Sequence, residues 1–389
     1  MNSNHYDILF VGGGLVNSLL AWQLKRIKPW LRFLILEKGH TLGGKHTWSF
    51  HEQDVSPAAL EWLKPLLSAV WPFYEVAFPK YHRIIASRYF SIRSRKLHEV
   101  ITKELFENIL FDQSVLRIEG DRVLLQDGRQ IQGRVIVDGR GLHAWEPATL
   151  GFQKFVGLEL ELNHPHGLKG PVLMDATVAQ QDGYRFLYCL PWTETRLLVE
   201  DTRYSRVPEL DIEGTRQEIL NYCLSKAWQV KEIFDEEQGC LPLPLSNNFI
   251  QGGRSPEEVR ETPLTVGMRG GFFHPTTGYS FPCAVETVEL LLSAHEESDW
   301  PRLLESQKKK LAETQSFYWW LNRVLFCSVA DEKRFELLQH FYQLPDDVIH
   351  AFYSGRMGWL DKVRFFLRTP PVSVSAALRV WNWGTVNGN

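Results

Sequence analysis

The chain has 389 residues, of which 44% are apolar and 23% are charged, and its formal net charge is −3. This composition predicts a globular protein of one large or two medium domains, and the small negative charge argues against nucleic acid as a partner. The five cysteines form no CxxC pair, and the histidines lack the spacing of metal ligands. We therefore expect a reducing compartment and no bound metal.

The first forty residues have the order of a dinucleotide-binding βαβ unit. An apolar run at 7–11 leads into three glycines at 12–14, and a helical pattern follows until Pro29. A second buried run at 33–36 then ends in Glu37. Strand, tight turn, helix, strand and acid is the sequence pattern typical of this unit.

Each position in this unit has a physical task. Gly12 permits the sharp turn out of the strand, and Gly14 lets a pyrophosphate approach the backbone at Leu15, where the helix begins. Glu37 lies about 20 residues further on, where a carboxylate accepts hydrogen bonds from an adenosine ribose. The third glycine of the G-x-G-x-x-G pattern is replaced by Asn17, so the motif alone is weak evidence for a nucleotide.

Glycine-rich turns recur after the βαβ unit. One follows Glu37, a second follows the buried strand 135–137, and a third follows the strand 264–266, before a helix that is expected to start near Phe281. Turns at the carboxyl ends of such strands face the ligand in nucleotide-binding sheets. The further residues predicted to contact the cofactor are Gly44, Lys45, Asp138, Gly139, Gly271, Thr277, Gly278 and Tyr279.

The middle of the chain has the alternating pattern of an antiparallel sheet, and the end is helical. Aromatic and β-branched residues at 71–92 suggest strands of a second layer, and apolar stripes at 301–328 and 331–343 predict helices. An inserted antiparallel sheet is a common way to build a substrate chamber. Its strand candidates are residues 155–162, 171–178, 184–190 and 196–202.

Several local strings, taken in order, make the chain similar to the bacterial flavin-dependent lycopene β-cyclases, within the hydroxybenzoate-hydroxylase superfamily. The resemblance covers nearly the whole chain. The strings are Gly43–Phe50, Met174–Val178, Leu198–Ser205 and Phe273–Ser280, with Phe352-Tyr353, Gly355-Arg356 and Thr369-Pro370-Pro371 further on.

The resemblance implies an α/β fold with a Rossmann-like FAD-binding domain, an inserted mainly antiparallel β-sheet substrate domain and a helical C-terminal region. The FAD-binding domain is expected to be discontinuous. We expect it at residues 1–70, 95–150 and 255–300, the substrate domain at 71–94 and 151–254, and the helical region, with possible membrane contact, at 301–389.

The resemblance also implies a reaction. Each linear end of lycopene is closed to a β-ionone ring, giving β-carotene by way of γ-carotene in carotenoid biosynthesis. The step is an acid-catalysed isomerisation without net redox change, and it requires reduced FAD, with NADPH or NADH as the expected reductant.

Glu200 is the predicted general acid. Protonation of an alkene requires an acid that stays protonated near neutral pH, and burial of a carboxyl group among apolar side chains raises its pKa. Glu200 ends an apolar strand and alternates onto the face of Leu198, whereas Asp201 points the other way. The alternative is an ordinary strand-end carboxylate paired with Arg196 or Arg203.

Aromatic side chains are the expected walls of the substrate pocket, because their electron-rich faces stabilise a cation without attacking it. Tyr184, Phe186 and Tyr188 share one strand face, and Tyr279 and His274 lie beside the third glycine-rich turn. Core packing is the alternative role for each aromatic side chain. For His274, which precedes a proline, the alternative is hydrogen bonding within the loop.

Two other functions remain open from the sequence. A flavin monooxygenase or prenyl-chain reductase shares the expected fold, and a prenyl-lipid escort is a non-enzymatic alternative.

The sequence has no convincing signal peptide and no apolar run of about 18 residues. Aromatic residues mixed with cations near the C-terminus, such as Trp359, Trp381 and Trp383 beside Arg368 and Arg379, suit either a core helix or a membrane surface. We expect a cytoplasmic protein associated peripherally with the inner membrane.

Overall fold

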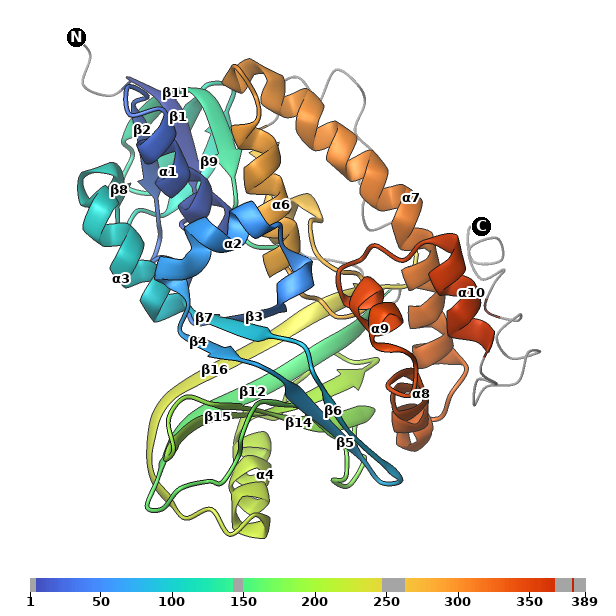
Figure 1. The fold of residues 1–389 in the computed structure, drawn as a ribbon. Helices are drawn as coiled ribbons and strands as arrows, with labels where there is room; N and C mark the ends of the chain where they lie inside the picture. Colours follow the sequence, from blue (N-terminus) through green and yellow to red (C-terminus); the bar gives the residue numbers. More distant parts are fainter. Residues whose placement is uncertain (1–4, 143–149, 247–262, 368–379, 381–389) are drawn as a thin grey trace.

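The computed structural model describes residues 5–142, 150–246, 263–367 and 380. A first half with helices packed on a mixed sheet lies above a large second sheet in Figure 1, and the C-terminal helices flank both. The predicted α/β fold class, with an inserted sheet and a helical C-terminal region, is therefore confirmed.

The first sheet is built around the βαβ unit that the sequence predicts. Its strand order is β8-β2-β1-β11-β10-β9, and β17 pairs with β11. The pairs β1–β2, β1–β11 and β2–β8 are parallel, whereas β9, β10 and β11 form an antiparallel meander. Its strands are β1 (His5–Val11), β2 (Phe33–Leu36), β8 (Ile109–Leu110), β9 (Val115–Glu119), β10 (Arg122–Leu125), β11 (Gln130–Asp138) and β17 (Leu264–Thr265).

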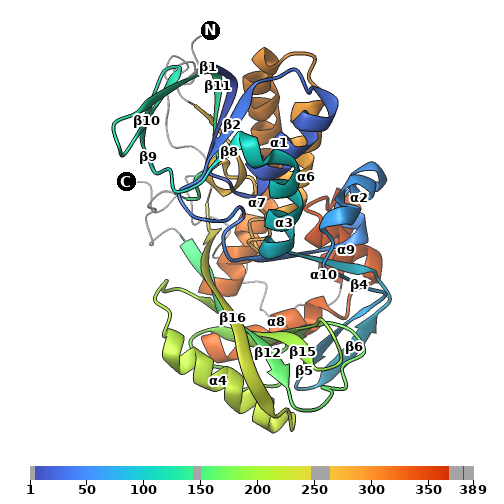
Figure 2. The same cartoon turned by 90° about the vertical axis from the view of Figure 1, so that its left-hand side faces the viewer.

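Three helices cover one face of this sheet, as Figure 2 shows. They are α1 (Leu15–Ile27), α3 (Ser94–Leu105) and α6 (Phe281–Leu292), and their apolar side chains share one core cluster with β1 and β2. The other face carries a separate cluster made with residues of β9 and β10. The sheet is thus buried on both sides, which explains the near-continuous apolar runs of β1 and β2.

The second sheet has the order β16-β12-β15-β14-β13-β5-β6, and only the β13–β5 pair is parallel. The helix α4 (Ile212–Ser225) packs on one face, below the sheet in Figure 1, and the C-terminal helices pack on the other. Its strands are β5 (Tyr74–Phe78), β6 (Tyr81–Ile85), β12 (Leu150–Leu162), β13 (Val172–Asp175), β14 (Tyr184–Pro191), β15 (Arg196–Ser205) and β16 (Val230–Pro244).

The strand β16 was not among the predicted strands. It is the edge strand of the second sheet, and its first half is exposed and rich in acidic residues. Charged side chains protect an edge strand from pairing with other chains, and they also hide the apolar alternation by which a strand is predicted.

A small third sheet joins the two halves. It has the order β3-β7-β4, with β3 (Thr47–His51), β4 (Ala69–Trp71) and β7 (Tyr89–Arg93), and α2 (Pro57–Leu63) follows β3 in the chain. The sequence assigns 71–94 to the substrate domain, and within that range β5 and β6 pair with β13 whereas β7 pairs with β3 and β4. The domain bounds remain a prediction.

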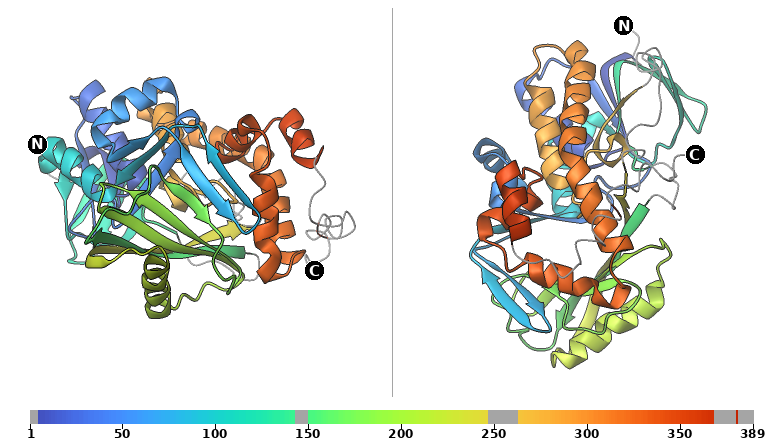
Figure 3. Two further views of the ribbon diagram at one scale, coloured as in Figure 1. Left: turned by 60° about the horizontal axis from the view of Figure 1, so that its bottom comes forward. Right: turned by 90° about the vertical axis from the view of Figure 1, so that its right-hand side faces the viewer.

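The C-terminal helices connect both halves. Helix α7 (Trp300–Cys327) begins in the core of the first half, through Trp300 and Leu304, and its later residues Tyr318 and Phe326 join the core of the second. Figure 3 shows α8, α9 and α10 grouped beside the end of α7. Their bounds are Arg334–Phe341, Asp346–Tyr353 and Trp359–Leu367.

Within the described ranges, no helix is long and apolar enough to cross a membrane. The predicted surface residues Arg368, Arg379, Trp381 and Trp383 and the string Thr369-Pro370-Pro371 lie outside those ranges.

Candidate functional site

One cavity of about 740 Å³ lies between the two halves, and both contribute to its wall. The first half supplies the turn after β1, the loop around Gly44, the turn at Gly139 and the segment before α6. The second sheet supplies side chains of β12, β13, β14, β15 and β16, including Glu200. A single space therefore joins the glycine-rich turns to the predicted acid.

The turn after β1 has the geometry that a dinucleotide requires. Gly12 has φ +88°, and a Cβ atom there would lie 3.2 Å from the backbone of Arg140. Gly14 has an ordinary φ of −70°, and a Cβ atom there would come no closer than 3.4 Å, to the carbonyl oxygen of Gly139. Gly12 is thus required by the fold, whereas Gly14 leaves space at the start of α1 beside Leu15.

Asn17, which replaces the third glycine of the motif, links the ends of two strands, β1 and β11. Its side-chain amide donates to the carbonyl oxygens of Gly12 at 2.8 Å and Val11 at 3.2 Å, and at 3.4 Å to that of Val137. A Cβ atom on Gly139 would lie 2.7 Å from the same amide nitrogen. The asparagine therefore ties together the carboxyl ends of the neighbouring parallel strands β1 and β11 by hydrogen bonds.

Glu37 lies in the cavity wall at the end of β2. Its carboxylate accepts the backbone N–H of Gly13 at 2.6 Å and that of Gly39 at 2.8 Å. These bonds orient the carboxylate against the turn and leave it lone pairs for a ribose hydroxyl.

The other residues predicted to bind the cofactor divide into two groups. Gly44, Gly139, Thr277, Gly278 and Tyr279 line the cavity. Lys45, Asp138 and Gly271 are not part of its wall.

The three predicted residues outside the cavity wall have structural roles elsewhere. Lys45 is exposed and pairs with Asp235 at 3.2 Å. Asp138 is buried between Arg140 at 2.8 Å and Arg269 at 2.7 Å, so it holds the turn that carries Gly139 rather than facing the cavity. Gly271, with φ +79°, ends a short 3-10 turn after β17.

Glu200 lies in the cavity wall on β15, and 9% of its surface is exposed. Its carboxyl group accepts a hydrogen bond from the hydroxyl of Thr202 at 2.5 Å. Burial raises the pKa of Glu200 to about 8, and the negative charge of Glu237 adds to the rise against the opposing effect of the Thr202 hydrogen bond. At neutral pH the group is therefore a protonated acid facing an apolar chamber.

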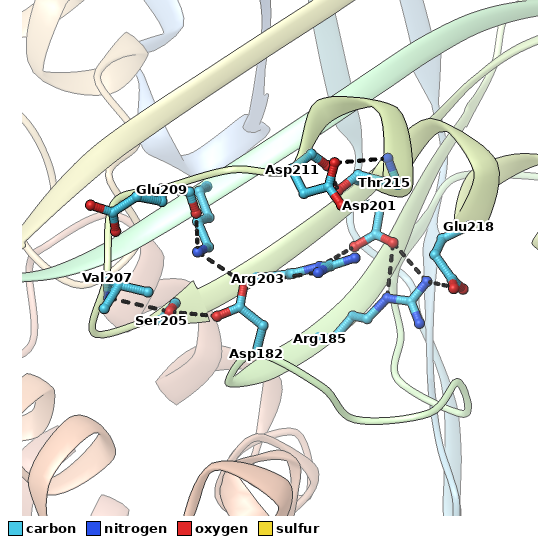
Figure 4. A network of polar contacts seen from close by, with 12 residues as sticks. Asp182, Arg185, Asp201, Arg203, Ser205, Val207, Glu209, Asp211, Thr215 and Glu218 are labelled. Carbon is cyan, nitrogen blue, oxygen red and sulfur yellow. Dashed lines mark hydrogen bonds and ion pairs between the residues drawn. The ribbon is translucent and has the colours of Figure 1, made fainter.

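The arginines that might have paired with Glu200 bind other carboxylates. Arg196 pairs with Glu159 at 2.5 Å, and Arg203 contacts Asp201 at 3.2 Å on the opposite face of β15. Figure 4 shows Asp201 between Arg203 and Arg185, and the Arg185 guanidinium lies 2.7 Å from it. The structure therefore does not support the alternative in which Glu200 forms an ion pair with Arg196 or Arg203.

The predicted aromatic residues lie at different depths. Phe186, Tyr188 and Tyr279 line the cavity, and the Tyr188 hydroxyl donates to Ser49 at 2.9 Å. Tyr184 shares the face of Phe186 and stacks on it with ring centroids 5.1 Å apart, but it lies behind the wall.

His274 also lies outside the cavity wall. Its Nδ1 atom accepts the backbone N–H groups of Thr276 and Thr277, both at 3.2 Å, and Nε2 lies 2.9 Å from the carbonyl oxygen of Phe352. Burial lowers its pKa to about 4, so the ring is neutral at physiological pH. These contacts match the loop hydrogen-bonding alternative and hold the Thr277–Gly278 turn against the cavity.

Nearly the whole chain matches a family model. Residues 7–379 match the model described as lycopene cyclase protein. The chain belongs to the lycopene cyclase family. A lycopene beta-cyclase from Pseudescherichia vulneris is 42% identical over 381 residues, covering 96% of each chain. One from Pantoea ananas is 40% identical, covering 96% of this chain and 97% of the relative.

Solved structures share the fold of this lycopene cyclase family member at low identity. A geranylgeranyl bacteriochlorophyll reductase-like protein from Thermoplasma acidophilum superposes with a TM-score of 0.60 at 12% identity, covering 98% of this chain and 96% of that one. A probable FAD-dependent monooxygenase from Pseudomonas aeruginosa gives 0.55 at 16% identity, covering 85% and 98%. These similarities establish the fold and leave the reaction to the site.

Sequence reasoning missed part of the cyclase-family site. The cavity is also lined by Phe155, Tyr204 and Tyr353, none of which was predicted as a pocket residue. Tyr204 could have been predicted, because residues 200 and 204 of one strand point to the same face of the sheet. Tyr353 comes from α9, and no local pattern indicates that this helix reaches the cavity.

In the described part of this lycopene cyclase family member, no group of three or more His, Cys, Asp or Glu side chains is arranged to hold a metal ion.

Proposed function

We propose that the chain is a lycopene β-cyclase that closes the linear ends of lycopene to β-ionone rings, giving β-carotene by way of γ-carotene. Cyclisation is an isomerase-type reaction, and the full-length match to curated lycopene β-cyclases supports it. The observation that carries the proposal is Glu200, a buried carboxyl with a raised pKa in the wall of an aromatic cavity that continues into a dinucleotide site.

FAD is the proposed cofactor, and the residues present fit it. The open start of α1 at Gly14 suits the pyrophosphate, and Glu37 suits the ribose. The Oδ1 atom of Asn17 is buried at this turn without a hydrogen-bond partner among the described residues. The segment Thr277–Gly278, before the N-terminus of α6, suits a polar edge of the flavin ring. Reduced FAD, with NADPH or NADH as its source of electrons, would supply an electron-rich ring that stabilises positive charge.

The chain's own residues carry the proton chemistry in the proposed reaction. Glu200 donates its proton to the terminal double bond of lycopene, and a neighbouring double bond attacks the resulting cation and closes the ring. Loss of a different proton restores the alkene, so product and substrate have the same mass. The faces of Phe186, Tyr188 and Tyr204 supply electron-rich walls that do not react with the cation.

We also propose that the enzyme binds a lipid surface on the cytoplasmic side of the inner membrane, because lycopene is insoluble in water. Helix α10 supports this proposal. Its residues Trp359, Leu360 and Val363 are 72%, 56% and 46% exposed and follow helical spacing along one side. Flotation with phospholipid vesicles tests it. Triple substitution of these residues by serine should abolish flotation, and resistance of the unaltered protein to carbonate extraction would contradict peripheral binding.

The reaction is tested with purified protein, FAD, a reductant and lycopene under anaerobic conditions. We expect a product of unchanged mass with the absorption spectrum of a cyclised carotene. A gain of oxygen would instead indicate a monooxygenase, and a gain of hydrogen a prenyl-chain reductase. Transfer of unaltered lycopene without bound FAD would indicate a lipid escort.

A further inference from the structure

A second glutamate lies in the same row of the second sheet as Glu200. In the ladder between β12 and β15, Gly157 is paired with Glu200, and in the ladder between β12 and β16, Gly157 is paired with Glu237. Paired residues on neighbouring strands point to the same face of a sheet. The next residues of β16 on this face, Gly239 and Leu241, line the cavity, so Glu237 faces the cavity side as well.

The glycine between them makes room for both side chains. A Cβ atom on Gly157 would lie 3.1 Å from Cγ of Glu237 and 3.5 Å from Cβ of Glu200. The Glu237 side chain therefore leans over the position that any other side chain would fill, and Glu200 lies at ordinary contact distance on the other side of it. Neighbouring strands are about 4.8 Å apart, so two carboxyl groups separated by one bare strand are within range of a substantial electrostatic interaction.

We propose that Glu237 is a positioning residue that holds Glu200 in its protonated form by placing a second carboxyl group across Gly157. This inference rests on the proposed function, in which Glu200 is the proton donor. A negative charge on Glu237 disfavours a second negative charge on Glu200, and burial of Glu200 has the same effect. Glu237 is the more exposed of the two, and burial raises its pKa to about 7 against about 8 for Glu200, so Glu237 ionises first and Glu200 keeps its proton to higher pH.

The other charged and titratable groups on this face do not cancel the effect. Burial raises the pKa of Glu237 to about 7, and the hydrogen bond from Thr47 opposes this rise by favouring the ionised form. Glu159 lies two residues after Gly157 on β12, and Arg93 of β7 and Arg196 of β15 both bind it. Its ladder partner on β16, Asp235, is bound by Lys45. The other groups near Glu200 are the hydroxyls of Thr202 and Tyr204 on its own strand, and those of Tyr188 on β14 and Tyr279 before α6.

The pH dependence of cyclisation tests the inference, because a purely structural role would not move it. The initial rate with reduced FAD and lycopene is measured from pH 6 to pH 10 for the unaltered enzyme and for Glu237→Gln. The loss of rate at high pH reports ionisation of Glu200. Glu237→Gln should shift this loss to lower pH by about one unit, the size expected when one nearby like charge is removed. Glu237→Asp, which keeps the charge, should stay close to the unaltered profile.

Glu236→Gln is the matched control. Glu236 precedes Glu237 on β16 but points to the other face, where it pairs with Arg216 of α4 at 3.3 Å. Its substitution should leave the profile unchanged. If Glu237→Gln does not retain folded structure by circular dichroism, Glu237→Ser at this partly exposed position replaces it.

The outcomes separate the two proposals. If Glu200→Gln is inactive at every pH and the Glu237→Gln profile is unmoved, the inference about Glu237 is overturned and the proposed acid stands. An equal shift in Glu236→Gln, or a full shift in Glu237→Asp, also overturns the inference. If Glu200→Gln remains active, the role of Glu200 fails, and the inference fails with it.

Discussion

The carboxyl groups of Glu200 and Asp201 are adjacent in sequence and lie on opposite faces of β15. Glu200 faces the cavity with only the Thr202 hydroxyl as a hydrogen-bond donor among the described residues, whereas Asp201 is fully buried between Arg185 and Arg203 (Figure 4). The alternation of a strand thus separates an acid whose pKa is raised by burial from a carboxyl group held between two guanidinium groups. The two residues should respond to substitution in opposite ways.

Glu200→Gln should lower the rate of cyclisation by a factor of about 10²–10⁴, the usual contribution of a general acid. Glutamine has the same shape and can accept the Thr202 hydrogen bond, so FAD binding should be unchanged. The measurement is lycopene consumption by chromatography, with flavin absorbance as the control. A variant that cyclises lycopene at the normal rate would exclude Glu200 as the acid.

Cyclisation should be constant at neutral pH and fall about tenfold per unit above pH 8. Burial disfavours the ionised form of Glu200 and raises its pKa to about 8, so the protonated donor is present below that pH and lost above it. Initial rates across the range check this, with protein fluorescence confirming the folded state at each pH. A rate that already falls above pH 5 would mean that the acid has an ordinary pKa.

Asp201→Asn should lower the free energy of unfolding by about 2–4 kcal/mol, because among the described residues it leaves the buried Arg185 guanidinium with the half-exposed Glu218 as its one acidic partner. The activity of the folded fraction should stay within about twofold of the unaltered enzyme. Urea unfolding measures the first quantity. Asp127→Asn, at an exposed pair with Arg129, should leave the unfolding midpoint nearly unchanged. Equal effects of the two substitutions would contradict the assignment.

Gly14→Ala should fold normally and bind FAD at least about tenfold more weakly, a loss of about 1.4 kcal/mol. The backbone at Gly14 accepts any residue, but the added methyl group occupies the approach to the start of α1. Gly12→Ala should instead destabilise the fold by about 1–3 kcal/mol, because its φ of +88° disfavours a side chain. Flavin titration and thermal unfolding distinguish the two. Normal FAD affinity in Gly14→Ala would rule out the proposed phosphate position.

Asn17→Gly would restore the generic glycine motif, yet it should destabilise this chain by about 1–3 kcal/mol. It removes the amide that donates to the carbonyl groups of Val11, Gly12 and Val137. Asn17→Ala, which avoids the helix penalty of glycine, should lose most of the same stability. Chemical denaturation measures both. Unchanged stability in Asn17→Ala would show that these hydrogen bonds do not stabilise the adjacent ends of β1 and β11.

The elements predicted correctly from the sequence are those that local periodicity determines. The unit β1, α1 and β2 was confirmed, since apolar spacing and turn glycines are properties of a few neighbouring residues. The same alternation placed Glu200 on the face of Leu198 and Asp201 on the other. Lys45 and Asp138 were predicted to contact the cofactor, and His274 to line the substrate pocket. In the structure their side chains bind neighbours outside the cavity wall.

The amino-acid sequence by itself determined the dinucleotide-binding unit, the alternating strands and the face of Glu200, because each depends on short-range spacing along one element. Only the tertiary structure decided that α9 brings Tyr353 to the cavity and that β16 aligns Glu237 with Glu200 across Gly157. The register between strands far apart in the chain is set by their pairing over many residues, and a shift of one residue would turn Glu237 to the opposite face.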